Sequence, residues 1–308
     1  MVLQAEAAVL GCLAVVLAGP LPAALSRAFW PRRDPRAALV AWQAVGLGGG
    51  LAILGAGLTL AAGSVDDHWL PGITALPSKL AHLGALGWAG VTLTLIAGGW
   101  LVATAATSAA RVVFSRRTHR HRLDAIAETV GVGVGLNRGG SVAVHLVDHP
   151  HAVAYCLPGL RPRVVVSLGA VRALGGAEFA AVVAHERAHA RGRHDLVIQP
   201  FVAWRETFPF LRTASRSVAA VELLVEMLAD DAARRTCRAE DLQQALRELS
   251  REHRERTGQA DPRLDGQLAA RITRLEMPPR PLSAAARISV YVLAAALVVV
   301  PPAILLAS

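Results

Sequence analysis

The chain has 308 residues, of which 53% are hydrophobic, and its mean hydropathy of +0.41 is too high for an ordinary soluble protein. This composition excludes a disordered chain, and three cysteines that lie far apart in the sequence exclude a disulfide scaffold. The formal net charge is +9, but we expect no direct nucleic-acid binding, because the sequence lacks the known duplex-reading motifs and the interleaved aromatic residues of a single-strand binder.

Four stretches contain no Asp, Glu, Lys or Arg and are long enough to cross a bilayer, which takes about 20 helical residues. We predict transmembrane helices in all four, at residues 7–26, 37–65, 80–110 and 288–308. The loop after the first stretch contains four arginines and one acid, whereas the loop after the second contains two acids and one lysine. Because short loops rich in Lys and Arg stay on the cytoplasmic side, we predict a multi-pass protein of the bacterial inner or plasma membrane, with residues 111–287 in the cytoplasm.

The polar block of residues 111–287 begins with a predicted helix over residues 122–130, which breaks at a glycine-rich run. Short runs of β-forming residues follow, separated by turn sequences, at residues 141–147, 152–156 and 163–167. The pattern then becomes helical over residues 177–191, 196–212, 215–238 and 239–256. A small sheet followed by helices indicates an α+β domain. We therefore predict a multi-pass α-helical membrane protein, with three transmembrane helices in residues 1–110, an inserted α+β domain in residues 111–287 and a fourth transmembrane helix in residues 288–308.

One motif in this block points to metal chemistry. Within an apolar helical stretch stands His185-Glu186-Arg187-Ala188-His189. Histidines four residues apart share one face of a helix, so both imidazoles can reach one zinc ion at about 2.0–2.1 Å. Glu186 lies beside the first of them and is placed to deprotonate a metal-bound water. The sequence therefore predicts the site of a zinc hydrolase, with His185 and His189 as ligands and Glu186 as the general base.

A catalytic zinc takes three protein ligands, and the third has to come from another segment. Glu222, Glu226 and Asp230 recur every four residues along a helix whose other positions are largely apolar. Like charges at this spacing destabilise a helix, and a bound metal would remove that penalty. The spacing alone leaves open which of these carboxylates is the ligand.

The residues quoted above, together with Gly192-Arg-His-Asp195 and Glu226-Met-Leu-Ala-Asp230, resemble the BlaR/MecR-type membrane zinc metallopeptidases, which are relatives of the heat-shock and CAAX-processing HExxH proteases. The resemblance extends to Asp148-His-Pro-His-Ala-Val-Ala-Tyr-Cys-Leu-Pro-Gly and to the arrangement of three spans, a cytoplasmic protease and a fourth span. It implies a zincin-like metalloprotease domain. It also implies that Glu226 is the third ligand and that Asp230 supports the ligand set.

Several neighbouring residues allow more than one interpretation. Asp195 either supports the site or caps a helix, or else lies with His194 at a plain surface position. Trp204, Phe208 and Phe210 either pack in the core, which we favour, or line an interfacial or substrate-facing surface.

The function that we predict is a membrane-anchored endopeptidase with Zn²⁺ as cofactor, which cleaves a protein substrate on the cytoplasmic side. The resemblance implies that this substrate is a transcriptional repressor of the winged-helix type in a signalling pathway. A quality-control protease for membrane proteins and a non-catalytic zinc-binding receptor or scaffold are the alternatives. Glu186 favours an enzyme, because a scaffold needs metal ligands but has no use for a base. The expected partners are the lipid bilayer and a protein or peptide substrate, which could pair with an edge of the sheet.

Overall fold

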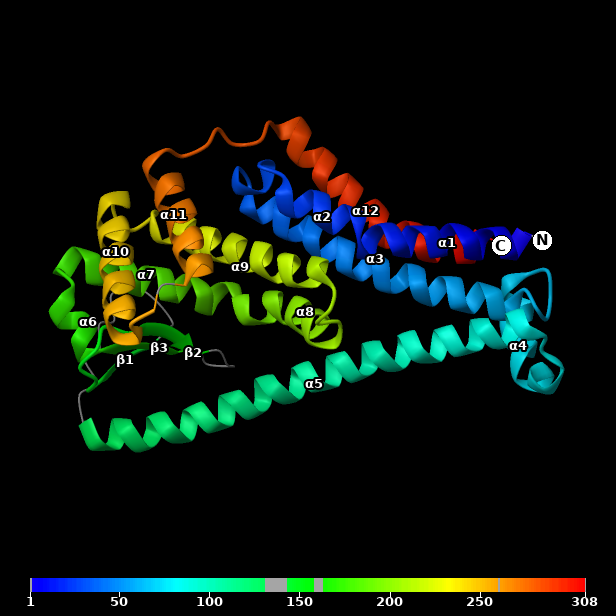
Figure 1. Ribbon diagram of the computed structural model, residues 1–308, viewed down its shortest axis with the longest axis horizontal. Helices are drawn as coiled ribbons and strands as arrows, with labels where there is room; N and C mark the ends of the chain where they lie inside the picture. Colours follow the sequence, from blue (N-terminus) through cyan, green and yellow to red (C-terminus); the bar gives the residue numbers. More distant parts are fainter. Residues whose placement is uncertain (1, 131–142, 158–162, 260, 308) are drawn as a thin grey trace. The chain divides into compact units, whose positions relative to one another are not determined.

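The computed structural model describes residues 2–130, 143–157, 163–259 and 261–307. The chain divides into two compact units (Figure 1). The first, here called the apolar unit, contains Met1–Ser108, Pro200–Val221 and Pro281–Ser308. The second, here called the polar unit, contains Ala109–Gln199 and Glu222–Arg280. The predicted glycine-rich break after residue 130 and the turn at residues 158–160 lie outside the described residues.

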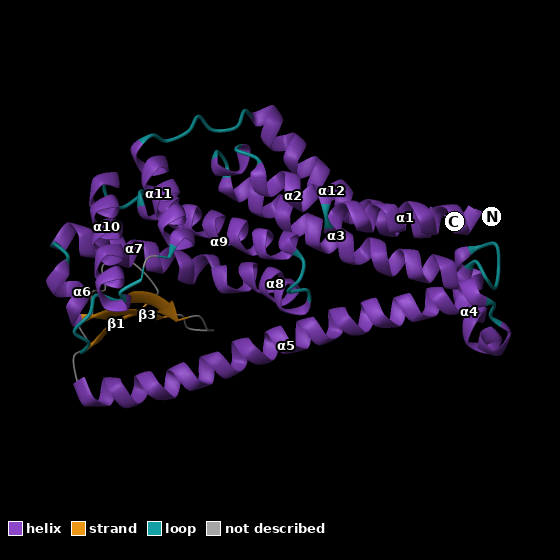
Figure 2. Ribbon diagram, viewed as in Figure 1, coloured by secondary structure: helices purple, strands orange, loops and turns teal. Residues whose placement is uncertain are grey.

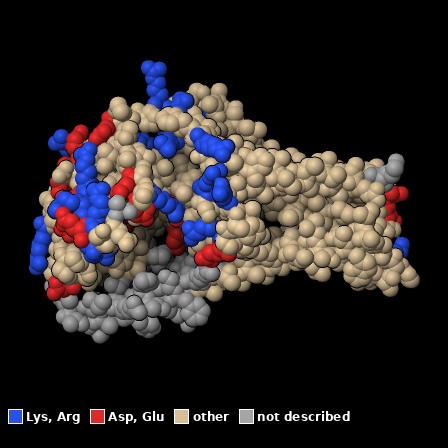
Figure 3. All heavy atoms as spheres, in the orientation of Figure 1, with Lys and Arg blue, Asp and Glu red and all other residues tan. Residues whose placement is uncertain are grey.

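The apolar unit consists of long helices at the four places where the sequence predicts them. These are α1 (Val2–Ala18) with α2 (Pro20–Arg27), α3 (Pro35–Ala62), the first part of α5 (Ala85–Val130) and α12 (Ala284–Ala307). By length and composition, four helical segments of the described chain could cross a membrane. On the face shown in Figure 3 the surface of these helices is mostly uncharged.

The structure differs from the sequence prediction in three details of this unit. The first span is broken between Ala18 and Pro20, because proline has no backbone N–H to continue the helical hydrogen-bond ladder. A short helix, α4 (Trp69–Lys79), occupies part of the predicted second loop, and short 3₁₀ turns lie at Trp30–Arg32 and Leu80–His82. The third span and the helix predicted over residues 122–130 form one continuous helix of 46 residues, α5.

Small residues allow the helices of the apolar unit to approach closely. An added Cβ at Gly48 of α3 would collide with the backbone of Leu297 in α12, and one at Gly57 would collide with Thr94 of α5. Backbones that approach at such positions gain van der Waals packing, the main attraction between helices in lipid.

At the N-terminal end of α3, Asp34 caps the helix and forms a 2.6 Å ion pair with Arg287 of α12.

A helical hairpin that the sequence analysis placed in the polar block belongs to the apolar unit. It comprises Pro200–Val221, the second part of α8 (His194–Thr207) and the first part of α9 (Arg212–Ala233). Its aromatic side chains explain this division. Phe201 packs edge-to-face on Trp42 with ring centroids 6.0 Å apart, and Trp204 packs on Trp100 at 6.2 Å.

The polar unit contains the small sheet that the sequence predicts. Its strands are β1 (Ala143–Val147), β2 (Ala154–Leu157) and β3 (Arg163–Ser167) in the order β1-β3-β2. Strand β1 runs parallel to β3, and β2 runs antiparallel to it. Figure 2 shows the sheet in orange. Strand β2 is therefore an edge strand of the described sheet.

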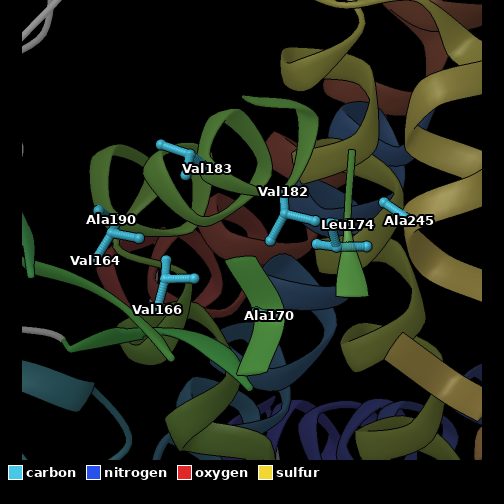
Figure 4. Close-up of a cluster of buried hydrophobic side chains, with 8 residues drawn as sticks. All are labelled: Val164, Val166, Ala170, Leu174, Val182, Val183, Ala190 and Ala245. Atoms are coloured by element: carbon cyan, nitrogen blue, oxygen red, sulfur yellow. The ribbon is translucent and has the colours of Figure 1, made fainter. Parts of the chain in front are cut away.

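The core of the polar unit fixes the helix that bears the histidine motif. Val164 and Val166 of β3 pack with Val182, Val183 and Ala190 of α7 (Gly176–Gly192). Figure 4 shows these side chains with the remaining members of the cluster, Ala170, Leu174 and Ala245, which belong to or follow α6 (Leu168–Ala173) and α10 (Ala239–Thr257). Burial of each valine contributes about 1.5–3 kcal/mol, so α7 is held firmly beside the sheet.

The sequence analysis missed the last helix of this unit, α11 (Pro262–Glu276). Its start carries a recognisable signal, because the Asp261 carboxylate accepts hydrogen bonds from the backbone N–H groups of Arg263 and Leu264 and proline occupies the first helical position. Arginines of α11 pair with acids of α9, among them Arg274 with Asp231 at 2.6 Å. These pairs hold α11 against the carboxylate-bearing part of α9.

Candidate metal centre

Three side chains from two helices of the polar unit meet at one point. The Nε2 atoms of His185 and His189 on α7 lie 3.1 Å apart. Glu226 of α9 places its Oε2 atom 3.3 Å from His185 Nε2 and its Oε1 atom 3.3 Å from His189 Nε2. Among the described residues these three form the group that could hold a metal ion.

The donor set fits zinc in both chemistry and spacing. Two neutral imidazoles and one carboxylate are a common ligand set of catalytic zinc sites. Ligands at about 2.0–2.1 Å from a tetrahedral centre are about 3.3 Å from one another. The two Nε2 atoms lie 3.1 Å apart, close to one such edge, and each oxygen of the Glu226 carboxylate lies 3.3 Å from one of them.

Asp230 supports His185 from the side away from the other ligands. Its Oδ1 atom lies 3.0 Å from His185 Nδ1, and its side chain is almost fully buried. A carboxylate at Nδ1 keeps that proton in place and leaves Nε2 for a metal. Burial alone would lower the pKa of His185, but the carboxylates of Asp230 and Glu226 raise the pKa to about 9 in the metal-free protein.

His194 supports His189 in a similar way, although the sequence allowed a plain surface position for it. Helix α7 ends at Gly192, and Arg193 adopts a left-handed conformation with a φ of 45°. This turn brings His194 back over α7, where its Nδ1 atom lies 3.0 Å from Nδ1 of His189. Burial, aided by the nearby charge of His189, lowers the pKa of His194 to about 4, so its neutral ring can accept a hydrogen bond from Nδ1–H of His189.

Gly192 makes this arrangement possible. A Cβ at this position would collide with the His194 ring. The glycine in Gly192-Arg-His-Asp195 was the available sequence signal, but its meaning depends on the turn at Arg193.

A buried arginine completes the centre, and the sequence analysis did not identify it. Arg271 of α11 forms 2.7 Å ion pairs with both Glu226 and Asp230, and its side chain is only 11% exposed. Burial alone would raise the pKa of Glu226, but contacts with His185 and His189 and the charge of Arg271 hold it well below the usual range. Burial would likewise raise the pKa of Asp230, but the hydrogen bonds from Arg271 and the neighbouring His185 lower it. Both carboxylates are therefore ionised at neutral pH.

Glu222, the alternative ligand on α9, lies outside this group. Its carboxylate pairs instead with Arg263 of α11. The two glutamates are one helical turn apart, and Glu226 is the one that contacts the histidines of α7.

The metal group borders a cavity of about 290 Å³. Glu186 contributes from α7 and Asp195 from α8, while Ala154, Tyr155 and Cys156 of the edge strand β2 form part of the wall. Burial, with smaller contributions from the charges of Glu186 and Asp195, raises the pKa of the Cys156 thiol to about 12. Cys156 is thus a protonated wall residue at neutral pH, and Glu186 and Asp195 are the carboxylates outside the metal group that border the cavity.

Comparison with known proteins gives one result. The model of peptidase family M48 matches residues 117–276, which is more than half of the chain. The matched range contains every residue of the candidate metal centre and its cavity. No curated protein and no solved structure gives a match to the chain. The family match does not single out the BlaR/MecR-type group within the wider set of proteases that the sequence resembles.

Proposed function

The chain belongs to peptidase family M48, a metallopeptidase family, and from this premise we propose that it is a membrane-anchored zinc endopeptidase. The observation that carries the proposal is the convergence of His185, His189 and Glu226 beside a cavity that Glu186 borders. Zinc at this group would polarise the scissile carbonyl and lower the pKa of the attacking water.

The residues of the chain have distinct tasks in this proposal. His185, His189 and Glu226 hold the metal, while Asp230 and His194 orient the two imidazoles through their Nδ1 atoms. Glu186 takes the proton from the attacking water and returns it to the leaving amine.

The substrate in this proposal is an extended polypeptide. Strand β2 is an edge strand of the described sheet, and its residues form one wall of the cavity beside Glu186. An extended segment that pairs with β2 gains backbone hydrogen bonds and lies along the metal group. Following the resemblance in the sequence, a winged-helix repressor is the first substrate to test.

The decisive experiment replaces Glu186 by Gln in the full chain. The variant keeps the size and hydrogen bonding of the side chain but cannot accept a proton, so it should bind zinc normally and lose proteolysis by about 10²–10⁴-fold. Zinc content is measured together with cleavage of a co-expressed repressor or of the chain itself. Glu222→Gln, which alters a carboxylate outside the metal group, is the matched control and should retain activity.

Two outcomes would count against this assignment. Undiminished cleavage by Glu186→Gln with full zinc occupancy would show that Glu186 is not the base. Identical behaviour of the wild type and Glu186→Gln in cells, with zinc bound and no cleavage by either, would favour a receptor or scaffold.

Membrane anchoring is the second part of the proposal, and it is supported by the four long apolar helices. A reporter fused after Arg256 should lie in the cytoplasm, and one fused at Asp66 should lie outside, because the arginine-rich loop of residues 26–36 stays on the cytoplasmic side. An external signal from a fusion within residues 123–280 would contradict this topology.

A further inference from the structure

The apolar unit contains a large cavity that the proposed proteolysis does not use. Its volume is about 1130 Å³, and its lining comes from α1, α3, α5 and α12 and from the hairpin of α8 and α9. Among the described residues, none that lines this cavity is charged. An apolar space of this size, in a unit whose helices are long enough to cross a bilayer, matches hydrocarbon chains better than water.

Aromatic side chains mark one side of the cavity. Trp100 of α5 lies 6.2 Å from Trp204 and 5.6 Å from Phe208 of α8, measured between ring centroids, and all three line the space. Tryptophan concentrates where the hydrocarbon of a membrane meets its headgroups. With the chain inserted as proposed, we expect this side of the cavity to lie at the level where lipid headgroups begin.

Two arginines of the hairpin directly follow residues that line the cavity. Arg205 comes immediately after Trp204, and Arg212 comes immediately after the lining residue Leu211. Arg216 lies one helical turn beyond Arg212 on α9, and both are exposed. With three arginines and one acid, Glu206, the hairpin combines an apolar face on the cavity with a net positive charge in the adjoining residues, the pattern of segments that bind anionic membrane lipids.

We propose that this cavity is a binding site for one anionic phospholipid, whose acyl chain fills the space and whose headgroup phosphate pairs with the arginines of the hairpin. The proposal goes beyond proteolysis and rests on the proposed membrane insertion. Charge distinguishes this occupant from a transmembrane segment of a substrate, because such segments carry Lys and Arg on their cytoplasmic side and would be repelled by Arg205, Arg212 and Arg216.

The test uses the full chain reconstituted into phosphatidylcholine vesicles. Phosphatidylglycerol or phosphatidylcholine with dibrominated acyl chains is added at equal mole fractions, and quenching of tryptophan fluorescence is measured. Lipids around the outside of the protein quench equally, whether the brominated lipid is phosphatidylglycerol or phosphatidylcholine. A lipid in the cavity lies beside Trp100 and Trp204, so brominated phosphatidylglycerol should quench more strongly, with a preference of about fivefold in affinity for each arginine engaged.

Matched variants locate the lipid. An added Cβ meets nothing within 4 Å at Gly46 or at Gly11, but of these two only Gly46 lines the cavity. Gly46→Leu should therefore remove the excess quenching by phosphatidylglycerol, and Gly11→Leu should retain it. Replacing both Arg212 and Arg216 by Gln, a surface change that leaves the helices intact, should also abolish the preference.

Three results would overturn the proposal. Equal quenching by the two lipids in the wild type would show that the occupant of the cavity is a polypeptide or an uncharged molecule. Unchanged excess quenching in Gly46→Leu would place the anionic lipid elsewhere. Failure of the chain to float with the vesicles would refute membrane insertion itself, and the lipid site with it.

Discussion

Zinc binding should release a proton from His185, and this can be tested by varying the pH. In the metal-free protein the carboxylates of Asp230 and Glu226 outweigh the effect of burial and raise the pKa of His185 to about 9. The ring is therefore an imidazolium at neutral pH. Metal binding requires a free Nε2 lone pair, so zinc has to displace the proton that this atom carries.

The size of the effect follows from the two pKa values. At pH 7 the ring is about two pH units below its pKa of about 9, so the apparent zinc affinity should be about 100-fold weaker than it is above pH 9. The affinity should rise about tenfold per pH unit over this window. Stability of the metal-free fold should change in the opposite direction. Because folding raises the pKa of His185 above 6.5, the ordinary value for histidine, the protonated ring stabilises the fold fully below about pH 6.5. This stabilisation is lost as the pH rises through about 9.

The assay is a competition titration with a chelator between pH 7 and 9.5, on the wild type and on Asp230→Asn. The asparagine removes the charge that favours the imidazolium, so the pKa of His185 should fall and the zinc affinity should vary less with pH. Asp230→Asn should also weaken zinc binding by about 10–100-fold at high pH, because the imidazole loses its supporting carboxylate. Equal pH dependence in both proteins would refute the reasoning, since it would show that Asp230 does not control the protonation of His185.

Three further predictions concern the same centre. Glu226→Ala should lose zinc while Glu222→Ala retains it, as measured by metal content; the opposite result would show that the wrong carboxylate has been chosen. Gly192→Ala should weaken zinc binding by about 10–100-fold by displacing the histidine two residues later, whereas Gly176→Ala on the same helix, where an added Cβ meets nothing within 4 Å, should not. Arg271→Gln should lower the unfolding free energy of the metal-free protein by about 3–5 kcal/mol, because the buried Asp230 and the part-buried Glu226 lose their cation. Thermal unfolding should show a smaller loss with zinc bound, and an equal loss in both states would contradict this role.

Much of the fold could be predicted because its signals are local. The four apolar stretches, the three short strands and α7 follow from hydrophobicity and period over windows of a few residues, and the structure places helices and strands there. The missed helix, α11, also carries local signals, because Asp261-Pro262 marks its start and Leu264, Leu268, Ile272 and Leu275 follow at helical spacing. The hairpin of α8 and α9 joins the apolar unit through Phe201 and Trp204, a contact that no local pattern reports.

The sequence by itself determined that His185 and His189 point to one side with Glu186 beside them, because a helix places residues four apart on the same face whatever surrounds it. The choice between Glu222 and Glu226 required the tertiary structure, since both have the same chemistry and only the packing of α9 against α7 selects the one that meets the histidines. Arg271 lies 86 residues from His185 in the sequence, and its contacts with Glu226 and Asp230 exist only because α11 folds onto α9. Ion pairs between distant segments depend on where helices cross, which is set by the packing of the whole unit and cannot be deduced from residue spacing.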